Sequence, residues 1–369
     1  MHLIVYMESL ALPDGWARRM SSTEGIEYYY QTAPVESSIS CWIHPSKHYS
    51  VYGDEELVDK CIEAFAQDAS VHARGSYGSV KKVIVDGIPY FVKRMYEETE
   101  PGDKMQVAIR RIYAKHAFVE NEIKVALDLT EKIPEYVSNI KAAEITLSPN
   151  PVGKGVFYID AFLIFEAPSG MNLHQYLKVR PPRMHNELYD TVYCMVKNAQ
   201  VALNNAGYVH RDIKPDNIYV LLDEMDNPTA CKLIDFGFTV KKGSVVPRVG
   251  TPTYTPKHIS NHLWHPLEVS TSQNDYSSDV IWTRDFKRDP ASKPKCSLVA
   301  ESNDFEVDMV GGGKAQSYKS QPNAKKVPGR KSSGARSLRK SSSFKKGGKK
   351  TYKKNSKLKQ RSRSSRKKL

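Results

Sequence analysis

Two features constrain the possible fold and chemistry of this chain more than any others. They are a ten-residue segment, 208–217, and an aspartate eighteen residues after its end. The segment carries Asp212, Lys214 and Asn217, and the later aspartate is Asp235, which Phe-Gly follows. Transfer of a phosphoryl group needs a carboxylate at the acceptor hydroxyl, oxygen ligands for Mg²⁺ and a cation near the transferred phosphate. Asp212 would supply the carboxylate, Asn217 and Asp235 the oxygen ligands, and Lys214 the cation.

A glycine-rich turn upstream would hold the phosphates of a nucleotide. Gly75 and Gly78 bracket this turn, Val80 follows it, and Lys93 ends a β-prone run thirteen residues later. A lysine on the far strand of the next hairpin would reach phosphates held under the turn. Taken alone, neither feature is specific, since short glycine-rich turns and solvated strand lysines are both common.

The lysine needs an anion to hold it in place, and the helix-compatible stretch 118–127 offers two. We favour Glu122 over Glu120, because Val125 and Ala126 lie three and four residues further on and give Glu122 an apolar face beside it. A single glutamate on a helix is more often a surface charge. We nevertheless predict that this glutamate pairs with the lysine.

The order of these motifs resembles that of the eukaryotic-type protein kinase family between residues 68 and about 258. The matching segments are the glycine-rich loop at 73–80, with Ala73 in place of its first glycine, the hinge at 163–170, the catalytic loop at 210–217, the magnesium-binding turn at 235–237 and the substrate-proximal loop at 250–254. The resemblance implies an α+β, bilobal fold. A β-rich small lobe, 68–165, would be joined by a hinge, 166–170, to a mainly helical large lobe, 171–310.

The resemblance also implies ATP and Mg²⁺ as cofactors and a role for each site residue. Asp212 would orient the acceptor hydroxyl and accept its proton, while Asn217 and Asp235 would hold Mg²⁺. Lys93 would contact the α- and β-phosphates and pair with Glu122. The nucleotide would lie against Ala73, Gly75, Gly78, Val80, Lys93, Phe165 as the gatekeeper, Glu166 and Pro168.

Two residues indicate which protein hydroxyls accept the phosphoryl group. Lys214 stands two residues past Asp212, as in Ser/Thr kinases, and Thr251 fits the same pattern. The resemblance therefore implies an ATP-dependent kinase that phosphorylates Ser and Thr hydroxyls of proteins.

The segment after the magnesium-binding turn departs from the family. Pro247 stands where similar kinases often carry a phosphorylated residue, so Arg211 would lack its usual phosphate partner. Either Thr239 or Ser244 substitutes, or activity does not depend on loop phosphorylation. We favour the second.

The large lobe departs as well. Pro256-Lys257 stands in place of the expected Ala-Pro-Glu, and only about fifty residues precede a basic tail. We expect a truncated large lobe, as in the short, divergent kinases of large DNA viruses or parasites. Asp279 is the first candidate for the aspartate that steadies the catalytic loop, and Asp308 the second. A pseudokinase scaffold is the alternative, although all four groups needed for catalysis are present.

Residues 10–46 form an aromatic cluster in which turn formers separate three short β-prone runs, and this pattern predicts a small three-stranded antiparallel sheet. With Trp16 and Trp42 standing 26 residues apart, the cluster resembles a WW domain. That resemblance implies a slot between Tyr28 and Trp42, flanked by Tyr30, for peptides that contain proline.

Two alternatives remain for this cluster. Arg19 and Ser21 leave weakened binding of phospho-Ser/Thr-Pro open, although Ser22 stands where related domains carry a phosphate-gripping arginine. The cluster would otherwise be a β extension packed on the kinase domain. Residues 47–67 would form a linker with a helix.

The basic tail, residues 311–369, holds 22 of the 55 Lys and Arg and none of the 41 Asp and Glu, so residues 1–310 carry a net charge of −8. A segment so rich in Lys, Arg, Ser and Gly cannot bury enough apolar surface to offset the entropy of ordering, and we expect disorder. Its charge would attract nucleic acid, and phosphorylation of its serines would weaken that attraction. A nucleic-acid-binding protein regulated by its kinase domain is therefore a further alternative.

The five cysteines are scattered, their number is odd and no pair stands at metal-ligand spacing. We take this to indicate a reducing compartment. No stretch approaches the roughly 18 to 20 apolar residues that cross a bilayer. The sequence therefore predicts an intracellular protein of the nucleus or cytoplasm, or of a virion if its source is viral, with no membrane partner.

Overall fold

The computed structural model describes residues 10–32, 39–67, 73–75, 78–153, 155–180, 186–261 and 266–297, all of which belong to one structural unit. The basic tail, for which the sequence predicts disorder, lies outside the described residues.

The first element is the three-stranded antiparallel sheet that the sequence predicts for residues 10–46. Its strands are β1 (Trp16–Met20), β2 (Glu27–Gln31) and β3 (Ser40–Cys41), in that order across the sheet. Trp16 pairs with Gln31, and Tyr29 pairs with Cys41. We call this element the N-terminal sheet.

The N-terminal sheet is packed on the rest of the unit. The ring of Tyr29 lies 5.0 Å from that of His44, and Ile43 is fully buried in the main hydrophobic core. The backbone N–H groups of Trp42 and Ile43 both donate to the carbonyl of Pro149, at 3.0 and 3.3 Å. The structure thus agrees with a β extension that rests on the small lobe.

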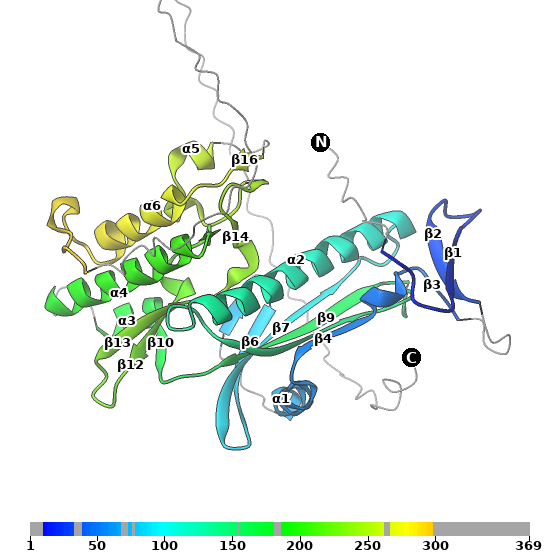
Figure 1. Ribbon diagram of the computed structural model, residues 1–369, viewed down its shortest axis with the longest axis horizontal. Helices are drawn as coiled ribbons and strands as arrows, with labels where there is room; N and C mark the ends of the chain where they lie inside the picture. Colours follow the sequence, from blue (N-terminus) through cyan, green and yellow to red (C-terminus); the bar gives the residue numbers. More distant parts are fainter. Residues whose placement is uncertain are drawn as a thin grey trace, which may run out of the picture. The chain divides into compact units, whose positions relative to one another are not determined.

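A six-stranded antiparallel sheet forms the small lobe (Figure 1). Its strands are β4 (Tyr49–Gly53), β5 (Ala73–Gly75), β6 (Gly78–Val85), β7 (Ile88–Glu98), β8 (Ile140–Leu147) and β9 (Tyr158–Glu166), in the order β4-β8-β9-β7-β6-β5. Between β7 and β8 lies helix α2 (Met105–Lys132). The strand, turn, strand, helix, strand, strand pattern that the sequence predicts for residues 68–165 is therefore present.

The segment expected to be a linker, residues 47–67, contributes to this lobe. It forms β4 at the edge of the sheet, where Tyr49 pairs with Thr146 and Gly53 with Ala142, and then α1 (Glu55–Gln67). The predicted helix is present, but it is not part of a free connection. Its residues Val58, Cys61 and Phe65 are buried against the sheet.

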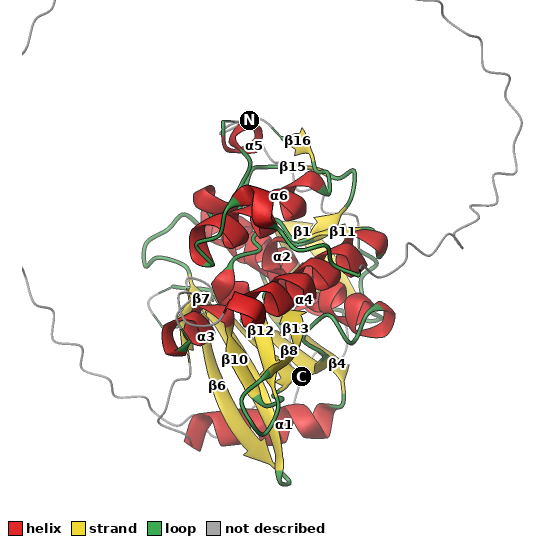
Figure 2. Ribbon diagram, turned by 90° about the vertical axis from the view of Figure 1, so that its left-hand side faces the viewer, coloured by secondary structure: helices red, strands yellow, loops and turns green. Residues whose placement is uncertain are grey.

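Helices α1 and α2 cover opposite faces of the sheet (Figures 1 and 2). Successive side chains of a strand point to opposite faces, so the two cores alternate along each strand. On β7, Val92 packs in the α1 core and Met95 in the α2 core. On β9, Ile164 packs in the α1 core and Leu163 in the α2 core. Because Lys93 follows Val92, its side chain points to the side of α2.

The large lobe combines helices with short strand pairs. Its elements are β10 (Gly170–Asn172), α3 (Leu173–Val179), α4 (Asn186–Asn205), β11 (Tyr208–Val209), β12 (Ile218–Leu222), β13 (Pro228–Leu233), β14 (Val240–Lys241), β15 (Val245–Val246), α5 (Lys257–Ser260), β16 (Leu267–Glu268) and α6 (Ser272–Val280). A capping box starts α3: the side chain of Asn172 accepts the N–H of Gln175 at 2.8 Å, and that of Gln175 accepts the N–H of Asn172 at 3.4 Å. Helix α4 buries Val192, Val196 and Leu203 on its predicted apolar face.

A disulfide joins α4 to the segment after α6. Cys194 and Cys296 are bonded with their Cα atoms 5.2 Å apart, while Cys41, Cys61 and Cys231 are free and buried. The scattered positions of the cysteines in the sequence do not by themselves predict this bond. The two cysteines stand 102 residues apart, and only the fold brings them together.

Within the described ranges, none of the helices combines the length and the apolar character needed to traverse a lipid bilayer.

Replacing Cys296 with Ser should lower the free energy of unfolding by roughly 2–4 kcal/mol, the usual contribution of a disulfide that closes a long loop. Thermal unfolding followed by circular dichroism, with and without a reductant, measures this. The reduced wild-type protein should match the variant, which should itself ignore the reductant. An unchanged wild-type unfolding midpoint under reduction would contradict the stabilising role of the disulfide.

Candidate active site

A pocket of about 440 Å³ lies between the six-stranded sheet and the large lobe. The predicted site residues that line it are Gly78, Val80, Lys93, Glu122, Phe165, Glu166, Pro168, Asp212, Lys214, Asn217 and Asp235. Ala73 and Gly75 are described only through their backbone, which pairs with Val80 and Gly78, and residues 76 and 77 lie outside the described chain. Residues from six separate stretches of sequence thus meet in one pocket.

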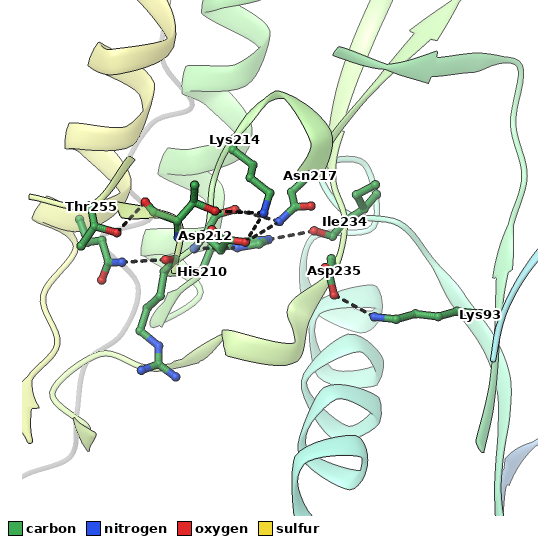
Figure 3. Close-up of polar contacts among 11 residues, drawn as sticks. Lys93, His210, Asp212, Lys214, Asn217, Ile234, Asp235 and Thr255 are labelled. Atoms are coloured by element: carbon green, nitrogen blue, oxygen red, sulfur yellow. Dashed lines mark hydrogen bonds and ion pairs between the residues drawn. The ribbon is translucent and has the colours of Figure 1, made fainter. Parts of the chain in front are cut away.

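Lys93 is held between two carboxylates (Figure 3 shows its contact with Asp235). Its Nζ atom lies 2.6 Å from Glu122 Oε1 on α2 and 2.8 Å from Asp235 Oδ1. The side chain of Glu122 is 1% exposed. The competing glutamate, Glu120, instead pairs with Lys47 and Lys124.

Lys93, Glu122 and Asp235 form an ion triad. Burial and the neighbouring charges have opposite effects on the pKa values of its members. Burial alone would lower the pKa of Lys93, but the carboxylates of Glu122 and Asp235 outweigh it and raise that pKa. Burial would raise the pKa of Asp235, but Lys93 outweighs it and lowers that pKa. Burial raises the pKa of Glu122. The lysine is therefore charged at neutral pH, ready to contact an anionic ligand.

The turn at Asp235 depends on the close approach of α2. Asp235 has φ 67°, in the left-handed region that non-glycine residues seldom occupy. A Cβ atom on Gly237 would lie 2.7 Å from Cζ of Phe118 and 3.3 Å from Oε2 of Glu122. Glycine at this position therefore lets the turn sit directly on α2 and keeps Asp235 beside the lysine.

The carboxylate of Asp212 is fixed from both sides (Figure 3). Its Oδ1 atom accepts the backbone N–H of Thr251 at 2.7 Å. Its Oδ2 atom accepts Lys214 Nζ at 2.8 Å and Asn217 Nδ2 at 3.1 Å. Lys214 also donates to Oγ1 of Thr251 at 3.1 Å. A carboxylate and an ammonium group are thus held together at the edge of the pocket, next to two residues suited to bind a metal.

Uncharged side chains of α6 support the catalytic loop. The N–H of His210 donates to Oδ1 of Asn274 at 3.2 Å, and Nε2 of Gln273 donates to the carbonyl of Arg211 at 2.8 Å. Asn274 is completely buried. Burial lowers the pKa of His210, whose ring also contacts the carbonyl of Ile234.

These contacts correct the expectation that Asp279 steadies the loop. Asp279 pairs instead with Lys293 at 3.0 Å, and its side chain is 46% exposed. Asp308 lies outside the described residues. Sequence reasoning missed Asn274 because an acid was sought, whereas an amide oxygen accepts the same N–H without burying a charge.

Arg211 finds partners in the backbone of the segment after the magnesium-binding turn. Its Nε atom donates to the carbonyl of Phe238 at 2.5 Å and its Nη1 atom to that of Pro247 at 3.2 Å. Burial lowers the pKa of Arg211 to about 10, so the guanidinium stays charged at neutral pH. A Cβ atom on Gly250 would collide with the carbonyl oxygen of Arg211, which explains the glycine there.

A second cavity, of about 550 Å³, lies on the N-terminal sheet. It is lined by Arg19, Met20, Ser21, Ser22, Tyr28, Ser40, Cys41 and Trp42. The ring of Tyr28 lies 5.9 Å from that of Trp42 and 6.0 Å from that of Tyr30. The three predicted peptide-binding aromatics are therefore neighbours, although Tyr30 does not line the cavity itself.

Comparison with known proteins identifies one family. The model of the protein kinase domain matches residues 72–282. A serine/threonine-protein kinase of Drosophila melanogaster is 40% identical over 72 residues, which are 19% of this chain and 10% of that protein. A serine/threonine-protein kinase of Myxococcus xanthus is 31% identical over 124 residues, 32% of this chain and 21% of that protein. The chain thus spans between a tenth and about a fifth of the length of these relatives.

Replacing Asn274 with Ala should destabilise the fold by about 1–3 kcal/mol, because the buried N–H of His210 loses its acceptor. Urea unfolding measures this. Asp279→Asn is the matched control and should stay within about 0.5 kcal/mol of the wild type, as exposed positions usually do. A larger loss for Asp279→Asn than for Asn274→Ala would return the supporting role to Asp279.

Proposed function

The chain belongs to the protein kinase family, and we propose that it transfers the γ-phosphoryl group of ATP to serine and threonine hydroxyls of proteins. One observation carries the proposal: Lys93, Glu122, Asp212, Asn217 and Asp235 all line a single pocket. These side chains are the groups that phosphoryl transfer needs for phosphate contact, metal binding and proton acceptance.

The residues present suit Mg²⁺. Asn217 directs Nδ2 to Asp212, which leaves its amide oxygen for other partners, and the side chain of Asp235 is 37% exposed. Amide and carboxylate oxygens are the hard ligands that Mg²⁺ prefers. When bound there, the ion would neutralise charge on the phosphate oxygens.

Asp212 and Lys214 would act on the acceptor and on the transferred group. The carboxylate of Asp212, held by Thr251, Lys214 and Asn217, would accept a hydrogen bond from the acceptor hydroxyl and then its proton. Lys214, whose Nζ atom lies 2.8 Å from Asp212 Oδ2, would stabilise charge on the transferred phosphate. The contact between Lys214 and Thr251 supports Ser/Thr specificity, as do the names of the relatives.

Activity without loop phosphorylation fits the surroundings of Arg211. Its guanidinium binds the carbonyls of Phe238 and Pro247, which occupy it in place of a phosphate. We propose that the segment is held in place by these bonds. A pseudokinase scaffold is less consistent with the site, because such a protein has no need for a lysine held by Glu122 and Asp235 beside Asp212.

The N-terminal sheet would dock partners that contain proline. Its cavity is bounded by Tyr28 and Trp42, aromatic walls on which flat proline rings pack in the preformed extended helix. The N–H of His44 donates to the hydroxyl of Tyr113 on α2 at 2.7 Å, so the sheet is fixed on the catalytic part. A docked protein would therefore be held at a constant place relative to the active site.

The basic tail lies outside the described residues, and its binding of nucleic acid remains a proposal that rests on its charge. The location of the protein in the nucleus or cytoplasm is likewise a proposal from the sequence.

Replacing Asp212 with Asn should reduce phosphate incorporation by about 10²- to 10⁴-fold, the usual contribution of a positioned general base. Radiolabelled ATP with Mg²⁺ and a generic basic protein substrate measures this, and phosphoamino-acid analysis identifies the acceptor residue. Asp279→Asn, which alters an exposed acid instead, should keep wild-type activity. Equal incorporation by wild type and Asp212→Asn would refute the role of Asp212, and phosphotyrosine in the product would refute the specificity.

Replacing Tyr28 with Ala should weaken binding of a fluorescent proline-rich peptide by at least about tenfold, since one wall of the cavity is lost and aromatic anchors dominate such contacts. Fluorescence anisotropy of the full-length protein measures the dissociation constant. Tyr96→Ala is the matched control, because Tyr96 is an exposed tyrosine on β7, outside the N-terminal sheet. Equal affinity of wild type and Tyr28→Ala would show that the peptide does not bind in this cavity.

A further inference from the structure

Aromatic rings surround part of the catalytic pocket. Phe91 lies two residues before Lys93 on β7 and therefore on the same face of the sheet, and Tyr219 lies two residues after Asn217 on β12. Both line the pocket, and their ring centroids are 5.7 Å apart with an interplanar angle of 71°. Phe165 lines the pocket as well and pairs with Phe91 across β7 and β9. A planar base that enters beside the phosphate-binding groups would meet these rings.

The hinge beside the rings offers few free backbone groups. Pro168 lines the pocket and has no N–H, and its carbonyl accepts the hydroxyl of Tyr219 at 3.2 Å. That hydroxyl also donates to the carbonyl of Gly170 at 2.7 Å. The N–H of Glu166 donates to the backbone carbonyl of Asn139 at 3.0 Å, and the carbonyl of Ser169 accepts the N–H of Leu222 at 3.2 Å.

Adenine and guanine differ in the order of donor and acceptor on one edge. Adenine presents an amino group beside a ring nitrogen that accepts, while guanine presents a carbonyl beside a ring N–H that donates. A backbone N–H facing this edge would bind adenine and repel guanine. Pro168, which lines the pocket, has no N–H and therefore cannot serve as such a donor.

Two kinds of group beside Pro168 do not separate the two purines. Stacking on aromatic rings tolerates any base, because every base has a π face. Oδ1 of Asn139, which lines the pocket, is buried and accepts no hydrogen bond from the described residues. An acceptor can bind the amino group of adenine or the N–H groups of guanine equally well.

We infer that this pocket holds a purine by apolar contact with the rings of Phe91 and Tyr219, which themselves touch edge to face, so that GTP serves beside ATP as the phosphate donor. The inference rests on the proposed function, since it concerns the co-substrate of the same site. Pyrimidine nucleotides should be poorer donors, because their single ring covers less of the two side chains.

The test measures kcat/KM of the full-length protein for MgATP, MgGTP and MgCTP with one basic protein substrate. We expect ATP and GTP to agree within about tenfold, whereas a site that reads the base through hydrogen bonds rejects the wrong one by about 10⁴-fold or more. A preference for ATP above about a hundredfold would overturn the inference.

Two variants identify the cause. Pro168→Ala restores a backbone N–H and should shift the ratio toward ATP by at least fivefold. Pro290→Ala, at an exposed proline far along the chain, is its control and should leave the ratio unchanged. Phe91→Leu should raise KM for both purines by the same factor. A change confined to one purine in Phe91→Leu, or an unchanged ratio in Pro168→Ala, would contradict the roles assigned to these residues.

Binding separates this inference from the proposed function. Displacement of a fluorescent ATP analogue by ATP and by GTP should give similar dissociation constants, whether or not transfer occurs. If neither nucleotide supports transfer but both displace the analogue equally, the proposed function fails, whereas the equal binding of the two purines stands. If ATP alone displaces the analogue and supports transfer, only the inference fails.

Discussion

The ion triad of Lys93, Glu122 and Asp235 is the interaction on which the rest of the site depends. It links three elements that are distant in sequence: strand β7, helix α2 and the turn that ends in Gly237. Glu122 is 1% exposed, so loss of Lys93 would leave its carboxylate as an uncompensated buried charge, which costs roughly 3–5 kcal/mol. The turn approaches α2 so closely that a Cβ atom at position 237 would force the ring of Phe118 to shift.

Elsewhere in the large lobe, uncharged groups stand where charged ones would be expected. Asn274 and Gln273 support the catalytic loop through amides, and Arg211 is satisfied by two carbonyls. A neutral acceptor avoids the desolvation cost of a buried carboxylate, while it still satisfies the donor. The loop is thus held by hydrogen bonds whose strength does not depend on a second titrating group.

Features that are local in sequence could be predicted, and features that depend on the meeting of distant segments could not. The helical spacing along α4 and the strand pattern of the small lobe are local, and the structure contains both. The apolar residues that follow Glu122 favour it over Glu120 as the partner of Lys93, and in the structure Glu122 contacts Lys93. The support from Asn274 and the disulfide from Cys194 to Cys296 join segments 64 and 102 residues apart, and no short pattern marks either pair.

The catalytic part begins earlier in the chain than the family match indicates, because it includes Ile43 and strand β4. The family match begins at residue 72, yet β4 completes the sheet before that point and Ile43 is buried in the same core as α2. Elements that share one core lose their contacts together, so they unfold in one cooperative transition. Strand β4 and the segment around Ile43, which directly follows the N-terminal sheet, accordingly belong to the same thermodynamic unit as the catalytic part.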